Sequence, residues 1–314
     1  MPYLTTKRAF HACCSDRGGD VVLGGDEIAG SLSLSGVCTH TLACGLQTAS
    51  SMEILERDSS GAKGHFFEIL PPLSCGSIYD PAAVVIDENE SDKGQVLLLG
   101  GWDDTESSIT VRKVDLATGV CTAQPSSLLC PQGRLVQDCM AGRLLDGRIV
   151  CVGTTHKSFT SDGSSEEPEE EEGLHTMAQV LEPPPHDSPS DASWQWRALP
   201  EASVLHSECA GCVLSDDRFA NFGGKDASDA ITSSCQALTL DADGARWDSI
   251  PPMHSPRRGC ACAVIGKCVF VIGGVGSRAD EVDEVYEEGL GRWRHLPCIR
   301  PHDSQVYRAG SALL

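Results

Sequence analysis

The sequence predicts an all-β fold made of repeated four-stranded units. Three observations carry this prediction: apolar runs that end in a glycine pair, a bulky residue four positions before a proline, and turn-forming residues between these elements. The chain has 32 glycines and 17 prolines among 314 residues, which fits many short strands joined by tight turns. We therefore expect a chain that is nearly free of helix.

An apolar run that ends in two glycines recurs along the chain. The second glycine of each copy, or its equivalent in a decayed copy, is at Gly25, Gly101, Thr154, Gly224 and Gly274. A short apolar run bounded by glycine is typical of a buried strand, and glycine lets the backbone leave that strand through torsion angles that other residues resist. The intervals of 76, 53, 70 and 50 residues fit one four-stranded unit each, with insertions in the two longer ones.

A bulky or apolar residue stands four positions before a proline in five places. The pairs are Phe67 and Pro71, Cys121 and Pro125, Trp196 and Pro200, Trp247 and Pro251, and Trp293 and Pro297. Tryptophan fills three of these five positions although the whole chain has only 5 tryptophans, so chance is a poor explanation. Proline ends a strand because it cannot donate a hydrogen bond to the ladder.

Strands of small residues complete each unit. Cys13, Cys212 and Cys262 lie in such strands, each 11 residues before the first glycine of a pair, and we expect them to be buried. An acidic residue before a glycine turn, such as Asp115 before Gly119, marks a further strand. The predicted units span about residues 8–75, 76–130, 131–203, 204–254 and 255–300 of one domain, 1–314. Residues 301–314 form either a closing strand or the first strand of an incomplete sixth unit.

This order of elements resembles the kelch repeat over about residues 8 to 314. The copies at 205–251 and 257–297 match it best, whereas unit three is decayed and Cys121 replaces the usual tryptophan in unit two. The resemblance implies a kelch-type β-propeller, in which four-stranded blades pack around a central channel and the small-residue strand is innermost. An unclosed ring would expose apolar blade faces, so the chain either closes its ring with residues 301–314 or lacks a further segment or partner.

Two insertions interrupt the repeat. The first unit carries about residues 29 to 62, rich in serine, glycine and threonine, and the third carries an acidic loop at about 160–174. A block of like charge without apolar residues cannot order itself by burial, so we expect this loop to be disordered. A docking site for a basic partner is the alternative interpretation of the loop.

The formal net charge of −21 limits the classes of partner. With 45 acidic against 24 basic residues, the composition argues against nucleic acid and against anionic membrane surfaces. No apolar run reaches the roughly 18 residues of a membrane span, and the first ten residues carry no secretory pattern. We therefore expect a cytoplasmic protein whose 16 cysteines are free thiols.

The sequence predicts no metal, cofactor or catalytic site. Cys209 and Cys212 have the spacing of redox and zinc motifs, but no second pair or histidine cluster stands at a matching distance. Histidines at 11, 206, 254 and 302 lie near unit junctions. Copper oxidases that share the propeller architecture need two tyrosines and histidines that converge on one face, whereas the 4 tyrosines here stand at the chain ends, before a turn and in a repeat strand. Each glycine pair ends a strand and is not followed by the start of a phosphate-binding helix.

The resemblance implies that the binding site lies on loops at one mouth of the channel. These loops enter the innermost strand or follow the glycine pair, and their candidate residues are Arg8, Asp26, Trp102, Asp103, His206, Lys225, Arg257, Arg258 and Arg308. The four arginines predict a basic mouth that attracts an acidic peptide segment of a protein partner. The predicted function is a non-catalytic scaffold or adaptor. The alternative is a kelch-type enzyme, or a carbohydrate- or small-molecule-binding protein, with its site at the same mouth.

Overall fold

The computed structural model describes the chain most fully between residues 73 and 296, apart from residues 77, 79, 88–93, 102–108, 133, 158–174, 183–193, 203–206, 243 and 277–281. Outside that region it describes the backbone of β1 (Arg8–Ala9), β2 (Ala12–Asp16), β3 (Gly19–Leu23), β4 (Asp26–Glu27), β5 (Gln47–Thr48), β6 (Met52–Arg57), β7 (Gly64–Glu68) and β24 (Ala312–Leu313). The described secondary structure is strand, apart from one 3₁₀ turn at Glu288–Leu290. The all-β prediction is therefore confirmed.

Four sheets contain four antiparallel strands each, and a fifth sheet adds β24 to four such strands. We call them blades one to five. Blade one contains β2, β3, β6 and β7. Blade two contains β8 (Ala82–Asp87), β9 (Gln95–Leu99), β10 (Val111–Asp115) and β11 (Cys121–Ala123). Blade three contains β12 (Arg134–Arg143), β13 (Ile149–Lys157), β14 (His175–Glu182) and β15 (Gln195–Ala198).

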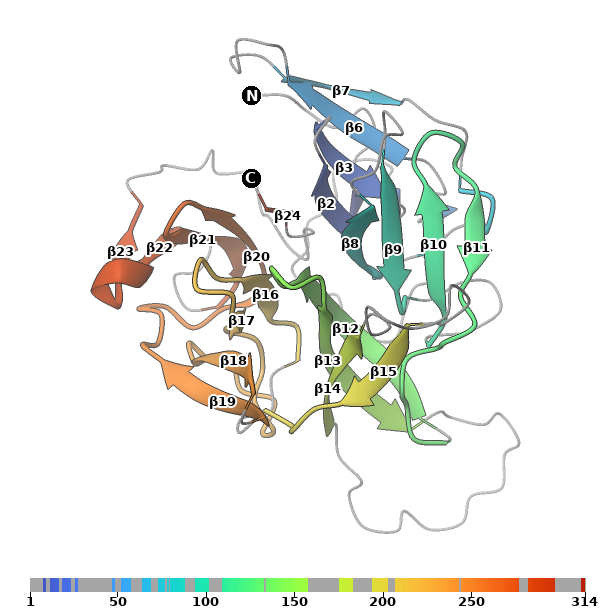
Figure 1. Ribbon diagram of the computed structural model, residues 1–314. Helices are drawn as coiled ribbons and strands as arrows, with labels where there is room; N and C mark the ends of the chain where they lie inside the picture. The colour runs from blue at the N-terminus through green and yellow to red at the C-terminus, as the bar shows by residue number, and fades with distance from the viewer. Residues whose placement is uncertain are drawn as a thin grey trace.

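Blade four contains β16 (Ala210–Val213), β17 (Phe219–Phe222), β18 (Cys235–Asp241) and β19 (Gly244–Ile250). Blade five contains β20 (Arg258–Ile265), β21 (Cys268–Val275), β22 (Glu284–Glu287) and β23 (Arg292–His295), together with β24. The first strands of successive blades contact one another in the order β2, β8, β12, β16 and β20, and Figure 1 shows them toward the centre of the molecule. This arrangement is consistent with a blade-type propeller.

The strand β24 is paired with the last blade. It pairs in parallel with β20, through Ala263 with Ala312 and Val264 with Leu313, and it also contacts β2. The last strand of the chain thus lies between the first strands of blades five and one, and Figure 1 shows it near the centre.

The core lies between neighbouring blades, and β13 shows how. Ile149 and Cys151 are buried in the cluster shared with blade two, whereas Val150 and Val152 are buried in the cluster shared with blade four. Successive side chains of a strand point to opposite faces of the sheet, so a blade buried on both sides needs an uninterrupted apolar run. This requirement explains the apolar runs before the glycine pairs.

The tryptophans and the prolines of the repeat are joined across neighbouring blades. Trp247 Nε1 on β19 donates a hydrogen bond to the carbonyl of Pro200, 2.9 Å away, at the end of blade three. Trp293 Nε1 on β23 donates to the carbonyl of Pro251, 2.7 Å away, at the end of blade four. Each tryptophan of these two blades therefore ties its outermost strand to the proline that ends the preceding blade.

The glycine pair of blade four is required by close backbone approach. Gly223 and Gly224 have φ angles of 67° and 94°, a region that favours glycine. A Cβ atom on Gly223 would collide with the carbonyl oxygen of Arg257, and one on Gly224 with that of Ser207. These two carbonyls belong to the segments that lead into β20 and β16, so the pair permits dense packing where the blades meet.

The structure corrects the predicted insertion of blade one. Within residues 29 to 62, β6 pairs with both β3 and β7 and is the third strand of the blade, and β5 pairs with β4 in a small separate sheet with β1. The prediction that this whole range is an insertion was wrong, because the third strand of the blade, β6, lies within it. The predicted acidic loop at 160–174 lies outside the described residues.

The cysteines on first strands differ in burial. Cys262 on β20 is buried as predicted, whereas Cys212 on β16 is only partly buried, and the side chain of Cys13 lies outside the described residues. Every cysteine side chain that the structure describes is a free thiol. No helix among the described residues is long and apolar enough to cross a membrane.

Candidate functional site

One end of the blades carries the loops that the sequence singled out. In a four-stranded antiparallel blade, the first and third strands begin at the same edge where the second and fourth strands end. We call this edge the loop face. It carries Lys225 after the glycine pair of blade four and Arg258 at the start of β20, and Ser207 pairs with Lys225 there as an isolated bridge.

Glu208 brings two of the predicted site residues together on the loop face. Arg258 Nη1 donates to Glu208 Oε2 over 2.6 Å, and Lys225 Nζ lies 3.5 Å from Glu208 Oε1 and 2.8 Å from Asp229 Oδ1. The Glu208 side chain is almost completely buried. Because carboxylates face both cations, this cluster is close to charge balance and holds the start of blade five against blade four.

The expectation that Arg257 is an exposed charge was wrong. Its side chain is completely buried, and its Nη2 lies 2.8 Å from Glu284 Oε1, whose side chain is also completely buried. Arg257 Nη1 and Nη2 also donate to the carbonyls of Gly273 and Val282, each over 2.9 Å. A cation removed from water needs such partners, so Arg257 holds blade five together and does not present its charge to a partner.

The backbone pairing places two further candidates on neighbouring strands. Arg8 in β1 pairs with Glu27 in β4, and Ala9 pairs with Asp26. The side chains of Arg8 and Asp26 lie outside the described part of the structure. Trp102, Asp103, His206 and Arg308 also lie outside it. The structure thus brings Lys225 and Arg258 together and removes Arg257 from the surface.

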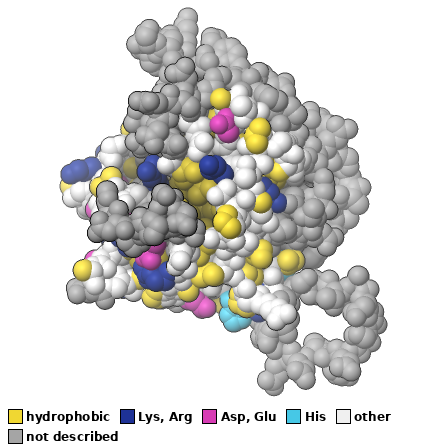
Figure 2. Space-filling view, turned by 45° about the vertical axis from the view of Figure 1, so that its right-hand side comes forward, with side chains coloured by type: hydrophobic (Ala, Val, Ile, Leu, Met, Phe, Trp, Pro, Cys, Tyr) yellow, Lys and Arg dark blue, Asp and Glu magenta, His cyan; other side chains and the backbone are white. Residues whose placement is uncertain are grey.

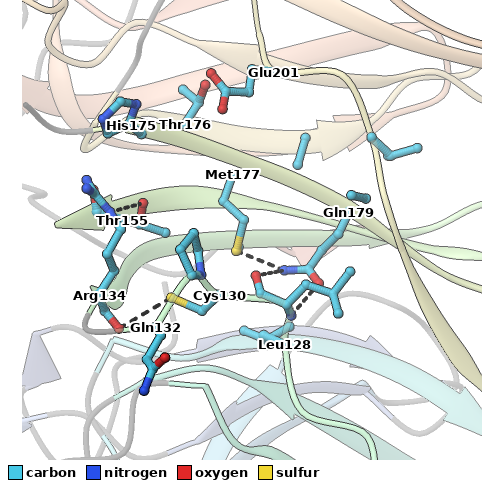
Figure 3. A pocket seen from close by; sticks show the side chains of 15 residues that line it. Leu128, Cys130, Gln132, Arg134, Thr155, His175, Thr176, Met177, Gln179 and Glu201 are labelled. Carbon is cyan, nitrogen blue, oxygen red and sulfur yellow. Dashed lines mark hydrogen bonds between the residues drawn. The ribbon is translucent and has the colours of Figure 1, made fainter. Parts of the chain in front are cut away.

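An open cleft of about 1080 Å³ lies on the loop face of blade three. The segment between β11 and β12 forms one side, and residues of β12, β13, β14 and β15 and of the segment after β15 contribute the rest (Figure 3). Its apolar side chains include Leu128, Leu129, Met177, Ala178 and Leu199, and its polar side chains include Arg134, His175, Gln179 and Glu201. The space-filling view also shows hydrophobic side chains gathered beside Lys and Arg side chains on one face (Figure 2).

Hydrogen bonds fix the polar groups of the cleft. Gln179 is buried, and its Oε1 accepts from the Leu129 backbone N–H over 2.8 Å, while its Nε2 lies 2.8 Å from Met177 Sδ. Arg134 donates from Nε and Nη2 to the hydroxyl and carbonyl of Thr155, at 3.1 and 3.0 Å (Figure 3). The cleft therefore has a preorganised wall, and Leu129 remains 43% exposed beside it.

Sequence reasoning did not find the cleft residues. The predicted sites concentrated on charges next to the first strand and the glycine pair, whereas the cleft depends on Leu129 and on the third strand β14. Two adjacent leucines in a connection, Leu128 and Leu129, were the available signal, because connections are usually polar. The bond between Gln179 and the backbone of Leu129 depends on the register of β14, which the sequence does not show.

The thiols of Cys209 and Cys212 have different partners in the structure. Cys209 Sγ donates to Met140 Sδ over 3.6 Å, and burial raises the pKa of its thiol well above the usual value. A hydrogen bond with the Cys262 thiol, together with burial, raises the pKa of Cys212. Both groups are therefore packed thiols with little thiolate character.

Cys75 and Cys121 form a different kind of thiol pair. Cys75 precedes blade two and Cys121 begins β11, and both side chains are partly exposed. A hydrogen bond from the Cys75 thiol lowers the pKa of Cys121 to about 6, and the same bond raises the pKa of Cys75. The Cys121 backbone N–H donates to Ser74 Oγ over 2.8 Å. This pair is the described site with the clearest thiolate character.

Comparison with known proteins gives information on the fold but not on the function. No protein-family model matches the chain, and no curated protein matches its sequence. A solved structure described as "Structure of YjhT" matches with a TM-score of 0.65 and 12% identity, over 100% of this chain and 89% of that one. At this identity the likeness shows the fold alone, an all-β arrangement of four-stranded antiparallel sheets of the blade type.

Proposed function

We propose that this chain is a kelch-type propeller that acts as a non-catalytic protein-binding platform, an adaptor that presents its loop face to a partner. The observation that carries the proposal is the open cleft of about 1080 Å³ on blade three. Binding sites are typically concave and mostly apolar, with a few polar groups in fixed positions. The repeated tryptophan-to-proline bonds and the glycine pair support the kelch type.

The cleft fits an extended peptide segment with an apolar anchor. Leu129 offers exposed apolar surface, and the bonds of Gln179 and Arg134 hold the surrounding groups in place before any partner arrives. Preorganised apolar pockets contribute most of the binding energy in many interfaces. An acidic side chain near the anchor is the proposed companion, because Arg134 lines the cleft.

Peptide display on the immobilised protein tests this proposal directly. We expect the selected peptides to share an apolar residue flanked by an acidic one, and Leu129→Asp to weaken their binding at least about 10-fold, since a hot-spot residue contributes more than 1 kcal/mol. The matched control is Leu145→Asp. Leu145 is 90% exposed and lies in the β12–β13 turn, at the opposite end of the same blade.

Two outcomes would contradict the platform proposal. Equal loss of peptide binding in the Leu129 and Leu145 variants would show that the cleft is not the site. Selection that returns no enriched peptide, together with retention of a small ligand, would move the assignment to the second candidate function.

The second candidate is a kelch-type enzyme, or a carbohydrate- or small-molecule-binding protein, that uses the same cleft. His175 and Glu201 line the cleft and are both exposed, so the site contains two side chains that can exchange protons with a ligand. A thermal-shift screen with sugars and small carboxylates is the measurement. A ligand whose stabilising effect is lost in the Leu129→Asp variant but kept in Leu145→Asp would favour this candidate.

The proposed compartment is the cytoplasm. The described cysteines are free thiols, and Cys151, Cys260 and Cys262 occupy buried core positions. Free cysteines in such numbers fit a reducing environment. Thiol counting on the denatured, unreduced protein checks this, since a secreted protein would yield disulfides.

A further inference from the structure

Two histidines and a glutamate meet at the loop face of blade five. His254 lies in the connection before β20, Glu284 begins β22 and His295 ends β23, directly opposite Glu284 in the strand register. His254 Nδ1 is 3.1 Å from Glu284 Oε2, and the two imidazole rings lie 4.6 Å apart between centroids at 34°. One ligand atom of each residue lies within 4.8 Å of the other two.

The repeat explains Glu284 but not the histidines. Pairing of Tyr286 with Trp293 and of Leu181 with Trp196 aligns β22 with β14, which makes Gln179 the counterpart of Glu284 in blade three. Both side chains have the same structural role. Gln179 Oε1 accepts from a backbone N–H of the preceding connection, and Glu284 accepts from two such N–H groups, at 2.8 and 3.0 Å.

The positions of the two histidines carry other residues elsewhere in the repeat. By the same register, Leu129 is the counterpart of His254, and Ala198 is the counterpart of His295. In blade four the counterpart of His295 is Ser249. The fold therefore does not need an imidazole at either position, and blade five combines two imidazoles with a carboxylate where the repeat requires only the buried polar group.

This set of donors matches a divalent transition metal. Two imidazole nitrogens and one carboxylate oxygen are a known three-ligand set for zinc, which binds nitrogen and oxygen at about 2.0–2.2 Å. Ligand atoms around a tetrahedral ion are then about 3.3 Å apart. His254 Nδ1 and Glu284 Oε2 already lie 3.1 Å apart, and both histidines are exposed, so a ring rotation brings the third atom into range.

The charges around Glu284 limit the affinity of the site for a metal ion. Glu284 Oε1 faces Arg257, while Oε2 accepts from the His254 backbone N–H and lies closest to the His254 ring. A metal ion would lie between Oε2 and Nδ1, and the remaining donors would hold the carboxylate in position as outer-shell partners. Because Arg257 already compensates the carboxylate, the affinity is expected to be modest, and water completes the coordination.

We propose that His254, Glu284 and His295 form a binding site for a divalent transition-metal ion of the zinc class, which links the connection before blade five to the outermost strand of that blade. The site belongs to the loop face but is separate from the cleft of blade three. Metal bound there stabilises the junction of the connection with β23, because three coordinate bonds then join the connection, β22 and β23.

Calorimetric titration of the chelator-treated protein with zinc chloride tests the proposal. We expect one equivalent to bind to the proposed site, and His254→Ala and His295→Ala each to weaken binding at least about 10-fold through loss of a direct ligand. The matched control, His175→Ala, removes an exposed histidine from blade three and should leave the affinity unchanged. His254 and His295 are both exposed, so the metal-free melting temperatures of the His254→Ala and His295→Ala variants should remain close to that of the unaltered protein.

Cobalt spectroscopy separates this site from adventitious binding by thiols. Cobalt(II) bound to imidazole and carboxylate gives visible bands without the thiolate charge-transfer band that cysteine ligands produce. Binding that survives in both histidine variants would overturn the proposal, and so would a cobalt spectrum dominated by thiolate ligation. Absence of any binding by the unaltered protein at millimolar zinc would overturn it as well.

Discussion

Arg257 Nη2 lies 2.8 Å from Glu284 Oε1, and both side chains are completely buried within blade five. The pair joins the connection before β20 to the third strand, and Arg257 also donates to the carbonyl of Gly273 in the glycine pair. The glutamate in turn accepts from the backbone of His254 and Ser255. One ion pair thus fixes the connection, the glycine pair and the third strand in one arrangement.

Arg257→Ala is expected to destabilise the protein. Removing one partner leaves the Glu284 carboxylate buried without its compensating charge, which costs about 3–5 kcal/mol in comparable pairs. Chemical denaturation measures the change in the free energy of unfolding. The control is Arg292→Ala, since Arg292 is 59% exposed and its bond to Glu287 should contribute less than about 1 kcal/mol. Equal stability of the two variants would show that the buried pair has no such role.

Trp293→Phe is expected to lower stability by about 1–2 kcal/mol. The change removes the bond to the Pro251 carbonyl, which then has no donor from Trp293, and it reduces the packing of Trp293 against Tyr286 and Phe222. Thermal unfolding measures the effect. Trp194 is 38% exposed, and Trp194→Phe is the matched control, with an expected change below about 0.5 kcal/mol. A larger loss in the control would contradict the role given to the inter-blade bond.

Much of the fold follows from the sequence because its repeated signals have separate physical causes. The apolar runs reflect burial on both faces of a blade, as the alternation of Ile149 and Val150 between two clusters shows. The glycine pair reflects close backbone approach at Gly223 and Gly224. The tryptophan reflects a bond to the preceding blade, and only the structure reveals that Trp293 reaches Pro251.

The candidate site was much less predictable. Position in a connection predicted exposure for both Arg257 and Arg258, but only Arg258 is partly exposed, because Glu284 lies where it can receive the neighbouring arginine. That distinction depends on the register of β22 and cannot be read from spacing in the connection. The approach of His295 to His254 likewise requires the pairing of β22 with β23.

Gly224→Ala is expected to cost about 3 kcal/mol or more. The backbone φ of 94° disfavours alanine, and the added Cβ would collide with the Ser207 carbonyl. The control is Gly266→Ala. Gly266 also has a positive φ, 61°, but its Cβ would meet open space, so only the conformational cost of about 1–2 kcal/mol applies. Denaturant midpoints of both variants check the difference. Equal costs would mean that the close approach of the blades contributes nothing.

Cys121 is expected to react with iodoacetamide faster than the other described cysteines at pH 7. The hydrogen bond from Cys75 lowers the pKa of Cys121 to about 6, so its thiolate predominates at neutral pH, and the thiolate is the nucleophile. The labelling rate should rise as the pH increases through 6 and level off above 7. Burial raises the pKa of Cys130, which should label slowly over the same range. Peptide mass spectrometry after timed labelling measures both rates.

Cys75→Ala is the variant that isolates the cause of this reactivity. Loss of the thiol donor should raise the pKa of Cys121 toward the ordinary thiol range of about 8.5, so labelling at pH 7 should slow several-fold and the midpoint of the pH profile should move upward. Cys130→Ala serves as the control, because Cys130 is not among the groups that shift Cys121. A midpoint near 8.5 in the unaltered protein, or an unchanged profile in Cys75→Ala, would show that the thiol pair does not control the charge of Cys121.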